Sequence, residues 1–316
     1  MEDGEKNNYM KQLAIVIPAY KIDFFRATLD SLAAQTCKDF TVYVGDDCSP
    51  SDFYSLLEEY KDRIDIRYTK FETNLGGKDL VAQWTRCIEL TEGEPWLWLF
   101  SDDDVMGERC VEAFYKEIEG GAKFDIYHFN VHVINEKGEI IKHPAKYPEL
   151  ISSKSFFRSK IRGTLECFVV EYVFTREIYN KINGFEPFDL AWGSDSATWI
   201  KMGKYNGIKT IVGDVIKWRS STSNITPMKD KEMSCRKLII SIDYILWARE
   251  FFFKDKEIQR LNKEFLLRRL KFYSTNITID DVRLVMDYAI KKKAFSTFTC
   301  SFMLIVFPLL KIMNRL

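Results

Sequence analysis

The sequence of 316 residues has no excess of charge of either sign and very few histidines. Lysine plus arginine and aspartate plus glutamate both number 46, so the overall charge gives no reason to expect a nucleic-acid partner. The 3 histidines form no close ligand set with cysteine, and we predict no zinc site. The 7 cysteines are scattered and lack the close pairs of metal sites, so we expect reduced thiols in a cytoplasmic protein.

Several targeting and nucleotide-binding motifs are also missing. Residues 1–12 are polar and contain no apolar core of the kind that a signal peptide needs. No G-x-x-x-x-G-K-[ST] loop occurs, and no G-x-G-x-x-G follows the first predicted strand. These absences weaken the cases for an ordinary ATPase and for a dinucleotide-dependent dehydrogenase.

Long apolar runs are absent until the C-terminus. The unbroken apolar stretch from Phe302 to Leu310 is too short to span a bilayer as a helix, and three lysines, 291–293, precede the surrounding segment. Two interpretations stay open: a helix that lies on an anionic membrane, at its inner face, or a last helix docked on the core.

What the chain does have is an alternation of short apolar runs with helix-like segments from Leu13 to about Leu99. This pattern predicts βαβ units, a mainly parallel sheet flanked by helices, and therefore an α/β fold. The predicted strands are 13–18, 40–45, 64–69 and 96–100, and the predicted helices are 24–35, 52–60, 78–90 and 107–117.

The second half gives a mixed pattern. We expect a strand over 124–134 that enters a hairpin at 135–138, and another strand over 167–174. One helix should end at Asn183–Gly184, and another should run from Ser194 to Lys204. From about Met228 onward the segments are helical. We therefore predict one domain over 1–226 and a C-terminal helical region over 227–316.

The central polar feature is Asp102-Asp103-Asp104, which directly follows the buried strand 96–100. Adjacent carboxylates repel one another unless a cation lies among them, and Mg²⁺ or Mn²⁺ takes oxygen ligands of this kind. The alternative is that one aspartate caps the helix 107–117. The position at a strand end, where α/β sheets bind ligands, favours the metal site.

Further polar residues follow other predicted strands. Asp46 and Asp47 can accept hydrogen bonds from a ribose or a base, although such pairs are common in turns. A loop containing Asn74, Gly76 and Lys78 opens a helix and can approach a phosphate, a weak signal by itself. Arg219, followed by hydroxyl residues, suits a diphosphate, and a solvated loop is equally consistent with this segment.

Acceptor-side candidates come from the second half of the sequence. Asp195 follows a small-residue turn and can take a proton from a hydroxyl, with Trp192 offering a face for a sugar ring. A helix cap is the simpler explanation of Asp195 taken alone. His128, Asn130 and His132 share one face of a strand, and the last two could line an acceptor cleft.

These motifs resemble the inverting family 2 glycosyltransferases of GT-A fold over about the first two thirds of the chain. Val16-Ile17-Pro18-Ala19-Tyr20 resembles the family's first strand, Asp46–Asp47 its nucleoside-binding acids, and Asn74 with Gly76 its N-x-G loop. Asp102 and Asp104 match the metal-binding D-x-D motif. Gly184-Phe185-Glu186-Pro187-Phe188 and Asp195 match the later G-F-x-x-F and catalytic-base motifs, and the closing loop matches Arg219, Ser221 and Ser223.

The resemblance implies a division of roles. Asp195 would be the catalytic base, and Asp104 and Asp102 would hold Mn²⁺ or Mg²⁺. The remaining donor contacts would come from Pro18, Tyr20, Asp46, Asp47, Asn74, Gly76, Lys78, Asp102, Asp103 and Arg219. The chain departs from the family at Ser101 and Ser194, where many members carry acids, which leaves open how metal and ribose contacts divide among 102–104.

The resemblance thus implies an inverting, metal-dependent transfer of a sugar from a nucleotide-sugar to a glycan or lipid-linked glycan, in polysaccharide or cell-surface glycan synthesis. UDP is the expected nucleotide only because members of the family commonly use it. A non-catalytic nucleotide-sugar-binding protein is the main alternative. A sugar nucleotidyltransferase should carry a basic, glycine-rich loop after the first strand, where this chain has Ala19-Tyr20-Lys21-Ile22-Asp23.

Overall fold

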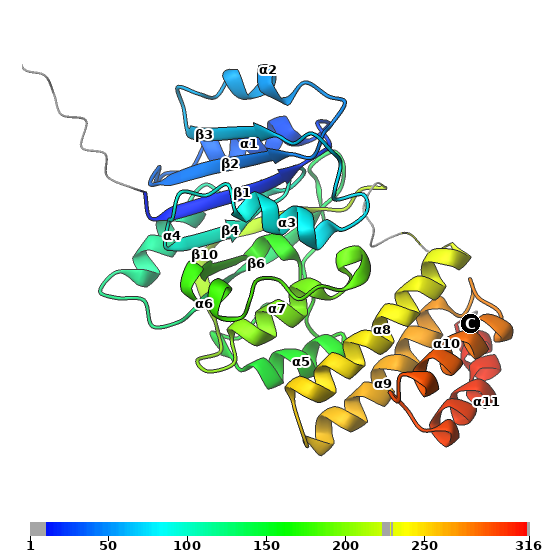
Figure 1. The fold of residues 1–316 in the computed structure, drawn as a ribbon. Coiled ribbons are helices and arrows are strands. Elements are labelled where there is room, and N and C mark those ends of the chain that lie inside the picture. Colours follow the sequence, from blue (N-terminus) through cyan, green and yellow to red (C-terminus); the bar gives the residue numbers. More distant parts are fainter. Residues whose placement is uncertain (1–10, 223–227, 229, 315–316) are drawn as a thin grey trace, which may run out of the picture.

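The computed structural model describes residues 11–222, 228 and 230–314, and shows a sheet between two layers of helices with further helices at one side (Figure 1). The predicted α/β fold with a C-terminal helical region is confirmed. The predicted domain boundary at Thr226–Pro227 lies outside the described residues.

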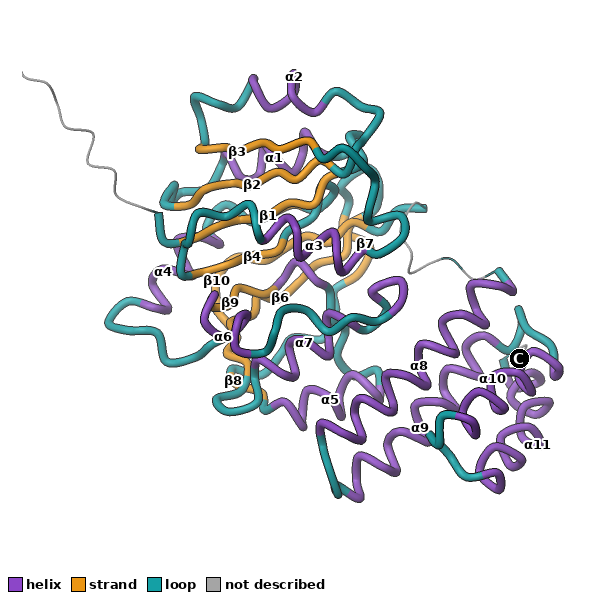
Figure 2. The backbone as a smooth tube through the Cα atoms, viewed as in Figure 1, coloured by secondary structure: helices purple, strands orange, loops and turns teal. Residues whose placement is uncertain are grey.

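The sheet has the strand order β3-β2-β1-β4-β9-β6-β10-β5, with β7 and β8 attached to β6 and β10 (Figure 2). Its strands are β1 (Leu13–Ala19), β2 (Phe40–Asp46), β3 (Asp65–Lys70), β4 (Trp96–Leu99), β5 (Val105–Met106), β6 (Ile126–Ile134), β7 (Ile140–Lys142), β8 (Leu150–Ile151), β9 (Tyr172–Thr175) and β10 (Ile208–Arg219). The first four pair in parallel, and β10 is parallel to β6. Because β9 is antiparallel to both β4 and β6, the strands β1, β2, β4, β6 and β10 all end at one edge of the sheet.

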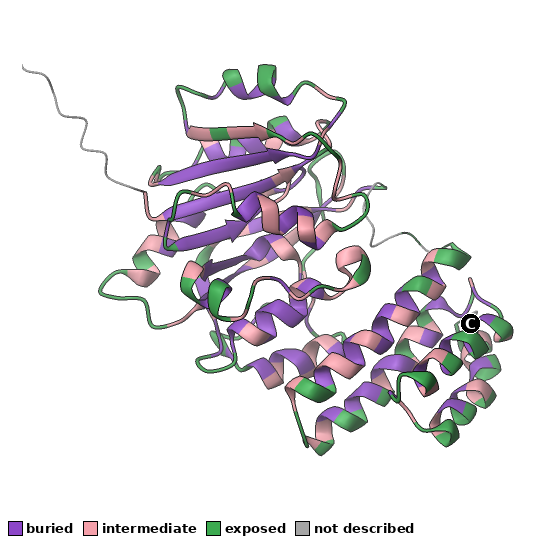
Figure 3. Ribbon diagram, in the orientation of Figure 1, coloured by how far each residue is buried: buried purple, intermediate pink, exposed green. Residues whose placement is uncertain are grey.

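Side chains of successive strand residues point to opposite faces, so each inner strand contributes to two cores. Along β1, Ala14 and Val16 join one buried cluster, whereas Leu13, Ile15 and Ile17 join the other. Figure 3 shows β1, β2 and β4 as buried, which is why these segments read as unbroken apolar runs.

Helices cover both faces of the sheet. The first cover consists of α1 (Phe25–Ala33), α2 (Phe53–Glu58) and α4 (Cys110–Ile118). The second consists of α3 (Leu80–Ile88), α5 (Ser153–Arg162), α6 (Arg176–Lys181) and α7 (Ser194–Met202). The helices predicted from the sequence in these regions are confirmed within a few residues at each end, whereas α5 was not predicted.

Two strand predictions need correction. The segment predicted as one strand over 167–174 forms a 3₁₀ turn at Val169–Glu171 and only then β9, because Phe168 N–H is capped by the Glu171 carboxylate at 3.1 Å. Conversely, β10 continues through Arg219, which the sequence pattern places after a strand; its backbone N–H donates to Asp104 and keeps this end ordered.

The C-terminal helices are α8 (Lys231–Phe251), α9 (Lys256–Tyr273), α10 (Ile279–Lys291) and α11 (Thr297–Met313). Their apolar side chains belong to the same buried cluster as α5, α7 and one face of the sheet. Helix α9 packs against α5, and α8 lies beside them (Figure 1). Among the helices described, none is both long and apolar enough to cross a membrane.

Candidate active site

Asp102 ties the end of β4 to the turn after β1. Its Oδ2 accepts hydrogen bonds from the backbone N–H groups of Tyr20 and Lys21, both at 2.8 Å. The side chain is buried, and desolvation together with the charge of Asp103 raises its pKa to about 6. Asp102 therefore fixes the backbone around the predicted donor residues Pro18 and Tyr20.

Asp104 joins the same strand end to β10. Its Oδ1 accepts from the Arg219 backbone N–H at 2.6 Å, and the Arg219 Nε donates to the Asp103 carbonyl at 2.7 Å. Burial, followed by the charge of Asp103, raises the pKa of Asp104 well above its usual range. The Ser101 hydroxyl donates to Asp103 Oδ1 at 2.6 Å.

The alternative role of the aspartate run as a helix cap does not hold. Helix α4 begins at Cys110, its N-cap position is Arg109, and β5 separates both from Asp104. The run instead joins the ends of β1, β4 and β10.

Asp46 and Asp47 are both buried at the end of β2, and each is engaged by protein groups. Asp46 accepts from the Ser49 N–H and from the Tyr68 hydroxyl, both at 2.7 Å. Asp47 accepts from the backbone of the loop at Leu75 (2.7 Å) and Gly76 (2.8 Å).

Arg86 of α3 completes this arrangement by pairing with Asp47 and stacking over the Phe71 ring, with its Cζ 3.8 Å from the centroid. Sequence reasoning missed Arg86, because a single arginine in an amphipathic helix carries no motif. A Cβ on Gly76 would lie 2.8 Å from Asp47 Oδ2, so this close approach requires glycine.

The side chain of Asn74 closes the same loop by accepting a hydrogen bond from the Gly77 N–H, and Lys78 is exposed.

Asp195 lies in the first turn of α7, one residue after its start, so it is not the cap of that helix. Its Oδ1 accepts from the Ser196 N–H at 2.7 Å, and the Cys167 thiol contacts Oδ2 at 3.7 Å. Asp195 faces a cavity of about 510 Å³ between the sheet domain and the C-terminal helices.

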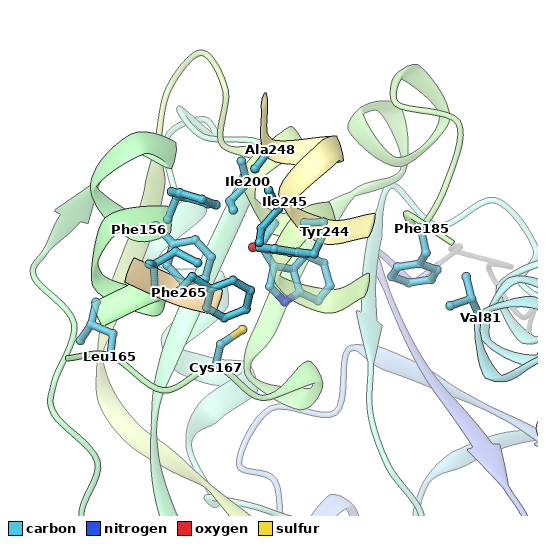
Figure 4. Packing of buried hydrophobic residues seen from close by; sticks show 14 of the residues in the cluster. Val81, Phe156, Leu165, Cys167, Phe185, Ile200, Tyr244, Ile245, Ala248 and Phe265 are labelled. Carbon is cyan, nitrogen blue, oxygen red and sulfur yellow. The ribbon is translucent and has the colours of Figure 1, made fainter. Parts of the chain in front are cut away.

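The cavity wall is largely aromatic on the side of α8 and α9. Figure 4 shows Tyr244 and Phe265 from these helices close to Cys167, and their ring centroids are 5.9 Å apart. Trp192 also lines the cavity, with Lys237 Nζ 4.3 Å and Arg269 Cζ 5.5 Å from its ring centroid. Trp218, one residue before Arg219, stacks on Phe168 and connects the cavity with the end of β10.

Asn130 and His132, predicted as acceptor contacts, do not line this cavity. The Asn130 Oδ1 accepts from the Tyr147 N–H at 3.0 Å, and His132 packs edge-on against His143 with ring centroids 4.5 Å apart. Their acceptor role stays a prediction. Ser223 of the predicted closing loop lies outside the described residues.

Within the described chain, no group of three or more His, Cys, Asp or Glu residues is arranged to hold a metal. A site at Asp102–Asp104 would therefore use at most two of these carboxylates. This arrangement still suits Mg²⁺ or Mn²⁺, which is often held by one or two carboxylates with substrate phosphates and water completing the shell.

Comparison with known proteins gives the family. The model of glycosyl transferase family 2 matches residues 14–182, which is more than half of the chain. The poly(ribitol-phosphate) beta-N-acetylglucosaminyltransferase TarS of Staphylococcus aureus is 29% identical over 132 residues, 41% of this chain and 22% of TarS. An uncharacterized glycosyltransferase of Rickettsia felis is 24% identical over 250 residues, 74% of this chain and 37% of that protein.

Among solved structures, S. aureus TarS 1–349 in complex with UDP-GlcNAc has a TM-score of 0.67 at 14% identity, with 96% of this chain and 89% of that chain covered. This likeness includes the C-terminal helices and confirms the GT-A fold. The sequence matches span only 22% and 37% of the two relatives' lengths. The chain belongs to glycosyl transferase family 2.

Proposed function

We propose that the protein catalyses inverting transfer of a sugar from a UDP-sugar to an acceptor hydroxyl, in the synthesis of a polysaccharide or cell-surface glycan. The observation that carries this proposal is the position of Asp195 on the wall of a cavity that also includes Trp218, next to Arg219, whose backbone N–H donates to Asp104. The fold neighbour TarS has been determined with UDP-GlcNAc and with UDP.

The donor nucleotide is assigned to the edge formed by the ends of β1, β2 and β4. Tyr20 is exposed there, and Asp47 is hydrogen-bonded to the Asn74–Gly76 loop. Asp46 accepts from the Ser49 N–H, and the Ser49 hydroxyl donates to the Tyr20 carbonyl. Arg219 at the end of β10 brings a cation next to Asp103 and Asp104, where a diphosphate would lie.

The carboxylates at this edge fit a divalent cation. Burial and mutual repulsion raise the pKa values of Asp102 and Asp104, so a cation would offset an unfavourable local charge. When bound there, Mn²⁺ or Mg²⁺ neutralises the diphosphate leaving group. A fold neighbour, GalNAc-T7, has been determined with UDP, GalNAc and Mn²⁺, at a TM-score of 0.55 and 10% identity.

In the chemical step, Asp195 takes the proton of the acceptor hydroxyl. The hydroxyl oxygen forms a bond to the anomeric carbon of the donor sugar while the bond from that carbon to the diphosphate oxygen breaks, and the electron pair leaves with the nucleotide diphosphate. A single in-line displacement inverts the configuration. The Ser196 N–H holds one carboxylate oxygen in place, which orients the base.

Release of UDP from UDP-GlcNAc in the presence of Mn²⁺ tests the function. A transferase releases UDP, slowly to water and faster once a suitable acceptor is added, whereas a non-catalytic binding protein releases none. Binding without release would contradict the proposal. A panel of other UDP-sugars extends the assay to the donor sugar.

We also propose that α11 contacts an anionic membrane at its cytoplasmic face. One face of α11 packs inward through Cys300, Met303 and Phe307. The opposite face exposes large apolar side chains at helical spacing: Phe298, Phe302, Ile305, Leu309, Ile312 and Met313. Lysines 291–293 precede this stripe, as expected for a helix on an anionic surface.

Sedimentation with phosphatidylglycerol vesicles tests this contact. The variant Phe302→Gln/Ile305→Gln/Leu309→Gln should lose vesicle binding without unfolding, because these side chains are exposed. Leu284→Gln on α10 is the control, since Leu284 is 69% exposed but lies outside the stripe. Unchanged sedimentation of the triple variant would contradict the proposal.

A further inference from the structure

The cavity beside Asp195 contains a cation, Arg269, that forms no ion pair with a carboxylate among the described residues. Arg269 comes from α9, in the C-terminal region beyond the segment matched by the family model. Its Nε is buried and has no hydrogen-bond partner among the described residues. Its guanidinium lies near two rings, with Cζ 5.0 Å from the Phe265 centroid and 5.5 Å from that of Trp192, and the side chain also interacts with Tyr273.

The position of Arg269 is unfavourable in free energy when no ligand is bound. Arg269 is partly buried and its Nε is fully so, and a charge without a carboxylate partner there loses hydration that ring contacts only partly replace. Burial accordingly lowers the pKa of Arg269. A ligand anion would supply the missing acceptor and form hydrogen bonds that are stronger than neutral ones.

The other charges around the cavity also favour an anion. Lys160 and Arg268 line it together with Arg269. Of the two carboxylates in the lining, Glu166 pairs with Lys142 at 2.7 Å and Asp195 is the assigned base. The cavity therefore has more positive than negative charge before any substrate enters.

The donor's own phosphates belong to a different part of the site. None of the ten residues assigned to the donor nucleotide is among the residues that line this cavity. The cavity lining comes near the assigned donor residues at Trp218, next to Arg219, and at Leu80, two residues after Lys78. An anion at Arg269 is thus on the acceptor side of Asp195.

We propose that Arg269 binds an anionic group of the acceptor, so that the substrate is a glycan or polyol bearing a phosphate or a carboxylate near the hydroxyl that is glycosylated. This inference rests on the proposed function. Trp192 packs against the uncharged part of the acceptor, Arg269 holds its anion, and Asp195 receives its proton.

Isothermal titration calorimetry with small charged fragments tests the assignment on the full chain saturated with UDP and Mn²⁺. The probes are glycerol 3-phosphate against glycerol, and glucuronic acid against glucose. We expect at least one anionic probe to bind more tightly than its neutral counterpart, and the stronger of the two identifies phosphate or carboxylate. Arg269→Met should weaken this binding by about ten-fold or more.

Arg260→Met is the matched control, because Arg260 lies on the same helix but is exposed and outside the cavity. It should bind the probes like the wild type. Thermal unfolding separates ligand binding from structure. Arg269→Met removes a partly buried charge that has no carboxylate partner among the described residues, so its Tm should stay equal or rise, whereas loss of a purely structural arginine would lower it.

Equal binding of charged and neutral probes, or equal binding by wild type and Arg269→Met, would overturn the proposal. The titration is therefore repeated without UDP: probe binding that occurs only in the absence of UDP would also overturn the proposal, because the anion would then occupy the donor's phosphate position. UDP release from UDP-GlcNAc does not need Arg269, so that assay reports on the proposed function independently.

Discussion

The two halves of the candidate site differ in how the protein treats its own charges. At the donor edge, the buried carboxylates of Asp46, Asp47, Asp102 and Asp104 all receive hydrogen bonds from protein groups. In the acceptor cavity, by contrast, Arg269 Nε is buried without a described partner. Hydrogen bonds within the protein hold the donor edge in shape, whereas the cavity has a hydrogen-bond donor, Arg269 Nε, that a ligand can use.

The two halves also differ in how far the family match covers them. The donor edge is built from segments within the family match at 14–182, apart from Arg219. The cavity adds α8 and α9, whose sequences fall beyond that match. A common nucleotide and a variable acceptor would produce this division.

The largest effect should come from Asp195→Asn. Loss of the general base should lower the transfer rate by about 10²- to 10⁴-fold, while UDP binding by calorimetry stays unchanged because the donor edge is intact. Asp189→Asn is the control, since Asp189 lies nearby but pairs with Arg236 on the surface. A wild-type transfer rate in the Asp195→Asn variant would remove Asp195 from the role of base.

The next largest effect concerns the donor edge itself. Asp47→Ala leaves Arg86 and two backbone N–H groups without their acceptor and should lower the free energy of unfolding by about 3 kcal/mol, measured by urea denaturation. Asp79→Ala removes only an exposed helix cap and should cost about 1 kcal/mol. Equal losses of unfolding free energy in the two variants would show that the contacts of Asp47 contribute no more to stability than an exposed helix cap.

Gly193→Ala tests how tightly the cavity wall is packed. Gly193 has a φ of +93°, and an added Cβ would lie 3.1 Å from Tyr244 of α8. We expect a loss of about 1–2 kcal/mol in unfolding free energy from the backbone, plus a contribution from the displaced ring. Gly120→Ala has a similar φ of +81° with nothing within 4 Å, so the difference between the two variants isolates the Tyr244 contact.

The smallest effect should come from the ion pairs between α5 and α9. Glu257 contacts Arg158 at 2.7 Å and Lys154 at 3.2 Å, and these hydrogen bonds lower its pKa to about 2. Because the folded pKa is depressed, the stabilisation is complete above about pH 4.5 and is lost as pH falls toward 2.

Glu257→Gln should therefore lower Tm slightly at pH 7 and not at pH 2, as measured by circular dichroism. The group is partly exposed, so 1 M NaCl should remove most of the difference. A large effect at pH 7 in high salt would mean that α9 is held to the sheet domain by these charges more than by apolar packing.

The sequence predicts the sheet well and the cavity poorly, for physical reasons. Strands β1, β2 and β4 are buried on both faces, so their composition alone identifies them, and carboxylates after them mark the ligand edge. The 3₁₀ turn at Val169–Glu171 has the same apolar composition as a strand; only the Glu171 cap distinguishes it. Arg269 gives one signal that could have been used: it lies on the inward stripe of α9 with Phe265, Leu266 and Tyr273, where a charge is unexpected.

The position of Asn130 shows the limit of reasoning from alternation along a strand. Its amide does share a strand face with neighbouring polar residues, but the chain returns at Tyr147 and uses it for a backbone hydrogen bond. Arg86 and Asp47 are likewise 39 residues apart. Such partners are set by tertiary contacts that one sequence does not reveal.

The single buried cluster that runs from the sheet through α5 and α7 into α8 and α9 has a consequence for evolution and engineering. Helices α8 and α9, which line the cavity, cannot be replaced as a unit by those of another protein, because their inner faces also pack against the sheet domain. A change of acceptor would have to proceed by point substitutions at cavity positions such as Arg269 and Phe265, or by replacing α5 and its following loop together with α8 and α9.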